Sequence, residues 1–150
     1  QREKMKALEF LVGDWTGTGK YFNGGTAVEF ASTERVEWAA GGTALMVTGK
    51  HTMDRRGHVL VIHDAVGLIT WEPKNKVHQM VSQLANGLSG TYELIVEGKG
   101  FTWSTPMPEG GSARYKMVLT PEGEWLETGE RSEDGKTWTK FVEMSLKRAR

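Results

Sequence analysis

The sequence predicts an all-β protein in which about ten antiparallel strands form an up-and-down barrel, preceded by a short N-terminal helix. Three observations carry this prediction. Clusters of turn residues recur at short, even intervals, apolar residues alternate with a period of two between them, and the length of 150 residues fits a single domain over positions 1–150. A chain of this size can bury a sizeable core without disulfides, and this one contains no cysteine.

The opening segment predicts a short amphipathic helix that leads into the sheet. Met5, Leu8, Leu11 and Val12 recur at helical spacing between Glu and Lys residues, and Gly13 stands where a helix would end. Beyond this glycine the period of the apolar residues changes to two, as strands require.

Nine clusters of turn residues divide the rest of the chain into ten strands. They are Asn23-Gly24-Gly25, Gly41-Gly42, Arg55-Arg56-Gly57, Pro73-Lys74-Asn75, Asn86-Gly87, Gly98-Lys99-Gly100, residues 106–111, Pro121-Glu122-Gly123 and Asp134-Gly135. Short turns between all consecutive strands are typical of an antiparallel meander, and a meander of this length can close into a barrel.

The segment 28–38 predicts most clearly which face of a strand points into the barrel, and that face carries a carboxylate. Its even positions carry Val28, Phe30, Ser32, Glu34, Val36 and Trp38. A register shift of one residue would bury Glu29 and Glu37 instead, so we expect the even face to point into the barrel. The inward Glu34 should then meet an Arg, Tyr or His or take up a proton, either as a structural pair or as a ligand contact.

Other segments add candidates for the wall of an interior cavity. Alternation favours an inward position for His51, Tyr92, Trp103 and Tyr115, whereas the segments around His63, His78 and Glu143 leave both faces open. The candidate ligand-binding residues are therefore Glu34, His51, His63, His78, Tyr92, Trp103, Tyr115 and Glu143.

Composition and motifs exclude several classes of function. The 19 Lys and Arg residues balance the 19 Asp and Glu residues and are interspersed with them, so we expect no nucleic-acid partner. No apolar run is long enough to span a bilayer. The four histidines lack the close pairing of a dedicated zinc site, although two or three of them could converge across neighbouring strands. No nucleophile elbow or phosphate-binding loop is present, so we expect no catalytic and no metal-ligating residues.

Two segments carry a family resemblance. The segment Phe10-Leu11-Val12-Gly13-Asp14-Trp15-Thr16-Gly17-Thr18-Gly19 resembles the first-strand signature of the calycin superfamily, which groups lipocalins, fatty-acid-binding proteins and nitrobindin-like barrels. The ending, residues 132–138 with Glu143-Met144 and Arg148, more closely resembles a bacterial calycin-like family of unknown function. In lipocalins a basic side chain from the end of the last strand covers the first-strand Trp, so the resemblance implies that Trp15 and Arg148 form a structural pair.

The resemblance also raises the question of haem, which nitrobindin-like proteins hold through a histidine on their closing strands. His63-Asp64-Ala65-Val66-Gly67 partly resembles a His-x-Glu-x-Gly segment of those proteins, with Ala65 in place of the acid. No histidine lies beyond His78, and Phe141 or Glu143 occupies the stretch where the resemblance would place the iron ligand. We therefore expect no haem and no other cofactor.

These observations favour a non-enzymatic barrel that binds a small, largely apolar molecule in its interior. The alternatives are a hydrolase or isomerase that uses an interior His and Glu34 as acid and base, a nitrobindin-like haem protein, and a filled structural or partner-binding barrel. No pattern specifies the ligand or the oligomeric state. The start at Gln1, without an initiator Met, fits a trimmed chain or a mature form after signal cleavage, and it slightly favours a periplasmic or secreted location over a cytoplasmic one.

Overall fold

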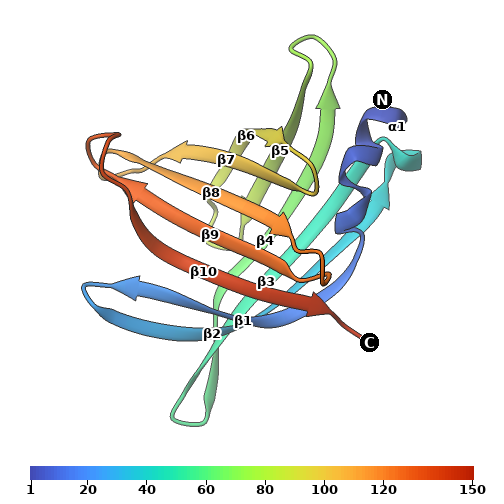
Figure 1. Cartoon of the computed structure of the whole chain (residues 1–150). Coiled ribbons are helices and arrows are strands. Elements are labelled where there is room, and N and C mark those ends of the chain that lie inside the picture. The colour runs from blue at the N-terminus through green and yellow to red at the C-terminus, as the bar shows by residue number, and fades with distance from the viewer.

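The computed structural model describes all residues from 1 to 150 and is a closed barrel of ten antiparallel strands (Figure 1). Each strand pairs with its neighbours in the sequence, and β1 closes the barrel against β10. The strands are β1 (Gly13–Asn23), β2 (Thr26–Ala39), β3 (Ala44–Arg55), β4 (His58–Glu72), β5 (Val77–Leu84), β6 (Ser89–Val96), β7 (Gly100–Pro106), β8 (Ser112–Leu119), β9 (Trp125–Ser132) and β10 (Thr139–Arg148). The predicted fold class is confirmed, and each of the nine predicted turn clusters lies at a junction between two consecutive strands.

Two of these turns are tight because glycine permits a left-handed backbone. Gly24 and Gly25 form the whole β1–β2 loop, with φ of 57° and 87°. Arg56 and Gly57 do the same between β3 and β4, with φ of 54° and 82°. Two consecutive positive φ values match the twist of the flanking strands, so both turns fix the register of their hairpins.

The N-terminal segment differs from the expected α-helix. Only α1 (Arg2–Met5) is α-helical, and a 3-10 helix, η1 (Lys6–Leu11), follows it. A 3-10 helix has three residues per turn, so Met5, Leu8 and Leu11 fall on one face, and all three are buried. Val12 is already extended and leads directly into β1.

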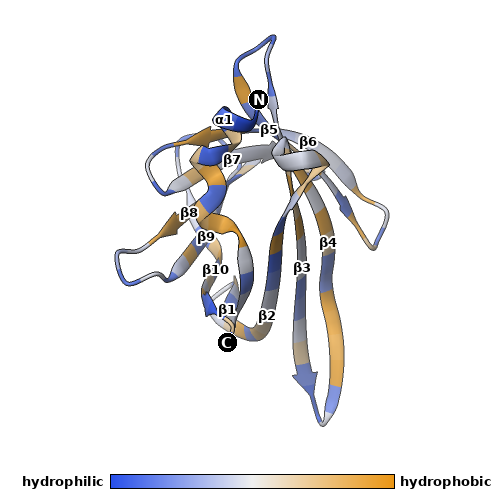
Figure 2. Ribbon diagram, turned by 90° about the vertical axis from the view of Figure 1, so that its right-hand side faces the viewer, coloured by the Kyte–Doolittle hydropathy of each residue, from blue (hydrophilic) through white to orange (hydrophobic).

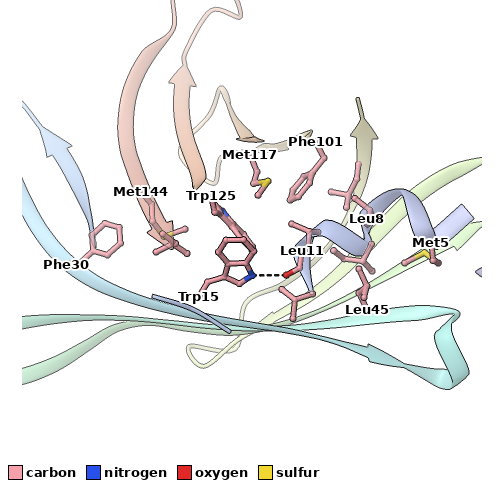
Figure 3. Close-up of a cluster of buried hydrophobic side chains, with 14 residues drawn as sticks. Met5, Leu8, Leu11, Trp15, Phe30, Leu45, Phe101, Met117, Trp125 and Met144 are labelled. Atoms are coloured by element: carbon pink, nitrogen blue, oxygen red, sulfur yellow. Dashed lines mark hydrogen bonds between the residues drawn. The ribbon is translucent and has the colours of Figure 1, made fainter. Parts of the chain in front are cut away.

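The hydrophobic core lies at the end of the barrel that this segment covers. The buried face of α1 and η1 packs among side chains that include Leu45, Phe101 and Trp125, as Figure 3 shows. Towards the ends of β2 the inner face becomes accessible, and Val28 and Trp38 are 36% and 40% exposed although they share the parity of the buried residues. Because Met5, Leu8 and Leu11 fill the interior at the covered end, the helical segment seals that end of the barrel.

Inward-facing glycines leave room inside the barrel. A Cβ atom at Gly19, Gly49 or Gly90 would collide with a neighbouring inward side chain, respectively Phe30, Glu34 and Tyr92, and one at Gly129 would collide with Val142 and crowd Tyr115. None of these four glycines has a positive φ, so space explains them better than backbone conformation does. The missing Cβ atoms leave space that these larger side chains occupy along the inner wall.

The ladder between β6 and β7 is much shorter than the others. Only Ile95 with Thr102 and Val96 with Phe101 are paired there, whereas β7 and β8 pair along seven positions from Gly100 to Pro106. Beyond the hairpin turn the two strands therefore diverge, and the wall of the barrel has a seam on this side.

The β3–β4 hairpin projects beyond the neighbouring strands and carries an apolar stretch, Val59–Ile62, which is coloured orange in Figure 2. All four of its residues are exposed. Among the helices of the structure, none is both long and apolar enough to cross a membrane.

Candidate ligand-binding cavity

The interior of the barrel contains a cavity with a volume of about 160 Å³. Leu11 and Trp125 line it at the helix end, and the strand residues around it come mainly from β2–β5, β7 and β9. Ten of its 16 lining residues are hydrophobic. Its polar side chains are Glu34, His63, Ser82 and Glu127. An apolar wall with a few convergent polar groups is the usual character of a small-molecule site.

Glu34 points into the barrel, as the alternation along β2 predicts. Its side chain is 11% exposed, and it pairs across the sheet with Trp15 on one side and Gly49 on the other. Because Gly49 has no side chain, the carboxyl group can lean against its Cα. No Lys or Arg pairs with this carboxyl group, and burial raises its pKa from 4.5 to about 8.

A second carboxyl group, that of Glu127 on β9, faces the same cavity. It accepts a hydrogen bond of 3.0 Å from the indole Nε1 of Trp125. Burial raises its pKa from 4.5 to about 7, and the neighbouring charge of Glu34 acts in the same direction. Glu127 was not among the residues predicted from the sequence, although Trp125, Glu127 and Gly129 alternate with Leu126, Thr128 and Glu130 in the same way as the residues of β2 do.

Two neutral imidazoles adjoin the carboxyl groups. His51 and His63 are directly paired across β3 and β4, and their rings stack with centroids 4.7 Å apart. The Nδ1 atom of His51 lies 3.2 Å from the hydroxyl of Tyr21. Its Nε2 atom lies 3.6 Å from Oε1 of Glu34, too far for a hydrogen bond, and has no other partner. Burial lowers the pKa of both histidines, so neither adds a positive charge at neutral pH.

Aromatic rings form a continuous band along the wall from β6 to β10. Trp103 packs between Tyr92 and Tyr115, with ring centroids 4.7 Å and 4.1 Å away. The ring of Phe141 meets the edge of Tyr115 at 5.7 Å. Burial raises the pKa of Tyr115 to about 12, so its hydroxyl stays protonated. Trp103 thus contacts both tyrosines and lines the cavity itself, whereas Tyr92 and Tyr115, which were also expected in its wall, lie beside it.

His78 lies outside the cavity, on the side of the helical segment. Its Nε2 atom is 2.9 Å from the backbone carbonyl of Lys4. Since a carbonyl only accepts, Nε2 carries the proton and donates it. The ring also meets the edge of Trp71, with centroids 4.9 Å apart. This histidine attaches the helical segment to the barrel.

Glu143 is on the outer surface, which corrects its inclusion among the cavity candidates. Val142 and Met144, its neighbours on β10, take the inward positions and pack against the core. A bulge between Lys140 and Val142 shifts the register of this strand, and short-range alternation could not reveal it. The carboxylate of Glu143 instead pairs with Lys140 at 3.0 Å.

Trp15 and Arg148 meet at the sealed end, as expected from the resemblance. The guanidinium carbon of Arg148 lies 4.3 Å above the indole ring. The same guanidinium donates hydrogen bonds to the carbonyls of Val12, at 2.6 Å, and Phe10, at 2.9 Å. The indole Nε1 of Trp15 donates to the carbonyl of Leu11 at 2.8 Å (Figure 3). These bonds join the first strand, the last strand and the helical segment.

No group of three or more His, Cys, Asp or Glu side chains is arranged to hold a metal ion. The fit to haem is also poor. The inward residues on β9 and β10 include Glu127, Val142 and Met144 but no imidazole, and the two interior histidines stack on each other across β3 and β4.

Comparison with known proteins identifies the fold. The sequence matches no protein-family model and no curated protein. The structure is similar to that of Rv2717c from M. tuberculosis, with a TM-score of 0.67 and 16% identity over 97% of each chain. It is also similar to the S-type phycobiliprotein lyase CPES from Guillardia theta, with a TM-score of 0.63 and 10% identity over 99% of this chain and 92% of the other. The likeness extends over nearly the whole of each chain, so this chain shares its fold, a closed barrel of ten antiparallel strands, with these two proteins.

Proposed function

We propose that this protein binds a small, largely apolar molecule in the barrel interior and does not catalyse a reaction. The observation that carries the proposal is the partly open cavity of about 160 Å³ in the barrel interior. Its walls are mostly hydrophobic, and Glu34 and Glu127 supply polar groups that can orient a ligand. The neighbouring structures share the fold at 16% and 10% identity, so their activities are not carried over.

The size of the cavity limits the ligand. Drug-sized sites occupy roughly 300 to 1,000 Å³. A cavity of about 150 Å³ holds a single benzene ring. The part of the ligand that lies inside this cavity is therefore about the size of one aromatic ring, and the remainder of a larger ligand can extend through its open side.

Acid–base catalysis is the second candidate, because His51 Nε2 lies 3.6 Å from the carboxyl of Glu34. Direct proton transfer needs a hydrogen bond whose two heavy atoms are about 2.6 to 3.2 Å apart. The imidazole and the carboxyl are slightly too far apart to exchange a proton directly. Binding therefore ranks above catalysis.

Fluorobenzene is a suitable neutral probe, and its binding can be followed by ¹⁹F NMR. We expect saturable binding to the wild-type protein. Ala65 lines the cavity, so Ala65→Leu should fill it and weaken the binding by about tenfold or more. Ala31→Leu is the matched control, because Ala31 lies on the exposed face of β2. Equal binding by both variants, or no saturable binding at all, would contradict the proposal.

A further inference from the structure

Two carboxyl groups share the cavity, and no basic side chain offsets them. Glu34 and Glu127 both line it, whereas no Lys or Arg does. None of the six ion pairs formed by Lys or Arg involves either residue, and the neutral imidazole of His51 comes only within 3.6 Å of Glu34. A cavity with two carboxyl groups and no lysine or arginine favours a ligand of opposite charge.

We infer that the ligand carries a positively charged nitrogen on an apolar body, as an aromatic or aliphatic amine does, and that its ammonium group lies between Glu34 and Glu127. This inference rests on the proposed function and specifies its ligand class.

The hydrogen-bonding state of the two carboxyl groups supports it. An ionised carboxylate can accept about four hydrogen bonds. Glu127 accepts one, from Trp125, and the side chain of Glu34 makes none. An ammonium group offers three donors and a full positive charge, so it would satisfy both groups at once. Without such a partner, burying the charged carboxylates is costly.

The aromatic wall adds a second source of attraction. Trp103 and Trp125 both line the cavity, and Tyr115 stacks on Trp103. The face of an aromatic ring is electronegative and attracts a cation within about 6 Å. The carboxyl groups and the aromatic faces would therefore attract the charge of an amine, and the apolar wall would contact its hydrocarbon portion.

The same arrangement disfavours an anionic ligand. Barrels that hold an apolar acid need a cation to pair with its carboxylate, and this cavity has none. The imidazoles of His51 and His63 are uncharged at neutral pH because burial lowers their pKa. A carboxylate ligand would face two acidic groups.

Proton release is the distinctive consequence. The titratable groups around the two carboxyls are Tyr21, His51, His63 and Tyr115, none of which is positively charged at neutral pH. In the empty protein the raised pKa of each carboxyl keeps a proton on it near neutrality, at about 8 for Glu34 and about 7 for Glu127. A bound ammonium group must displace that proton, so affinity for an amine should rise as the pH rises through these values.

The test compares three probes of one size and different charge: benzylamine, benzyl alcohol and benzoate. Calorimetric titration of the wild-type protein at about pH 9 should show benzylamine binding at least about tenfold more tightly than benzyl alcohol, with benzoate weakest. Between about pH 6 and about pH 9 the affinity for benzylamine should rise about tenfold or more, and that for benzyl alcohol should change little. At about pH 7, where the two carboxyls still hold protons, titrations in two buffers of different ionisation enthalpy should show net proton release with the amine only.

Variants test whether the two carboxyl groups are responsible. In the double variant Glu34→Gln/Glu127→Gln, the preference for benzylamine over benzyl alcohol should fall to about threefold or less, because the charge is lost and the shape is kept. Glu37→Gln, on the exposed face of the same strand as Glu34, should keep the wild-type preference. If the double variant does not fold, proton release by the wild-type protein decides the question.

Three outcomes are distinguishable. Benzyl alcohol that binds as tightly as benzylamine, without proton release, overturns the inference and leaves the proposed function intact. Tight binding of benzoate overturns it as well. Failure of all three probes to bind overturns both proposals.

Discussion

Glu34 and Glu127 are acidic residues buried without a cationic partner, and this makes folding stability depend on pH. The folded protein raises the pKa of both carboxyls, to about 8 and about 7, from the ordinary value of 4.5. Folded protein therefore holds protons that the unfolded chain releases. The stability that these protonated carboxyls contribute is fully present below about pH 4.5 and is lost as the pH rises through 7 and 8.

We predict that the wild-type protein is less stable at about pH 9 than at about pH 5 by several kcal/mol, because each unit by which the folded pKa exceeds the unfolded pKa is worth about 1.4 kcal/mol. Replacement of Glu34 by Gln removes one of the two ionisations, so the loss should be clearly smaller. Urea denaturation at both pH values measures it. Glu37→Gln serves as the control and should lose as much stability as the wild type. A parallel loss in all three proteins would show that Glu34 ionises freely in the folded state.

Whether a side chain points into or out of the barrel could be predicted only where apolar and polar residues alternate along the strand without a break. Glu34 and His51 lie on strands whose opposite faces differ clearly in polarity, and both point inward as predicted. His63 lies next to the register shift in the β3–β4 ladder, and Glu143 follows the bulge in β10. A bulge inserts one residue and reverses the parity beyond it, so alternation alone does not locate such side chains.

At the scale of whole elements, the helical segment and the last strand are joined through one arginine. Arg148 stacks on Trp15 and donates to the carbonyls of Phe10 and Val12, so it links β10, β1 and the end of η1. The spacing of Met5, Leu8 and Leu11 predicted a helix there. It did not distinguish an α-helix from a 3-10 helix, because residues three apart share a face in both.

We predict that Arg148→Ala lowers the free energy of unfolding by on the order of 1 kcal/mol, through the lost stacking and the lost packing of its aliphatic portion. Chemical denaturation monitored by tryptophan fluorescence would detect the change. Lys147→Ala, at the exposed neighbouring position, should alter stability by less than about 0.5 kcal/mol. Equal effects of the two substitutions would argue against a role for Arg148 in closing the barrel.

The fold of the whole molecule could be predicted because its signals are redundant. Nine turns and a repeated period of two lead to the same architecture, so an error in one strand does not change the result. The cavity could not be predicted in this way. Its volume depends on how side chains such as Trp103 and Tyr115 pack beside Gly129, and this packing is set by contacts between strands far apart in the sequence.

At this scale we propose that the protein works without haem, and we predict no tight stoichiometric haem binding and no Soret band typical of a histidine ligand. The inward side chains of β9 and β10 include no imidazole, and a cavity of about 160 Å³ is small for a macrocycle. Absorbance titration of the purified protein with haem tests this. A stable red complex that is lost on His63→Ala would contradict it.

The short ladder between β6 and β7 has a consequence for how molecules enter and leave. Backbone hydrogen bonds hold the other seams along most of their length, and here they stop after two residue pairs. Widening the wall at this place breaks few bonds, so local opening should cost less free energy here than elsewhere in the barrel. Tyr92 on β6 and Trp103 on β7 flank the seam, and their rings meet across it with centroids 4.7 Å apart. The barrel is thus held firmly where Arg148 joins its first and last strands, and it opens most easily between β6 and β7. The rate of ligand exchange would then depend on local opening at this seam and not on the stability of the whole fold.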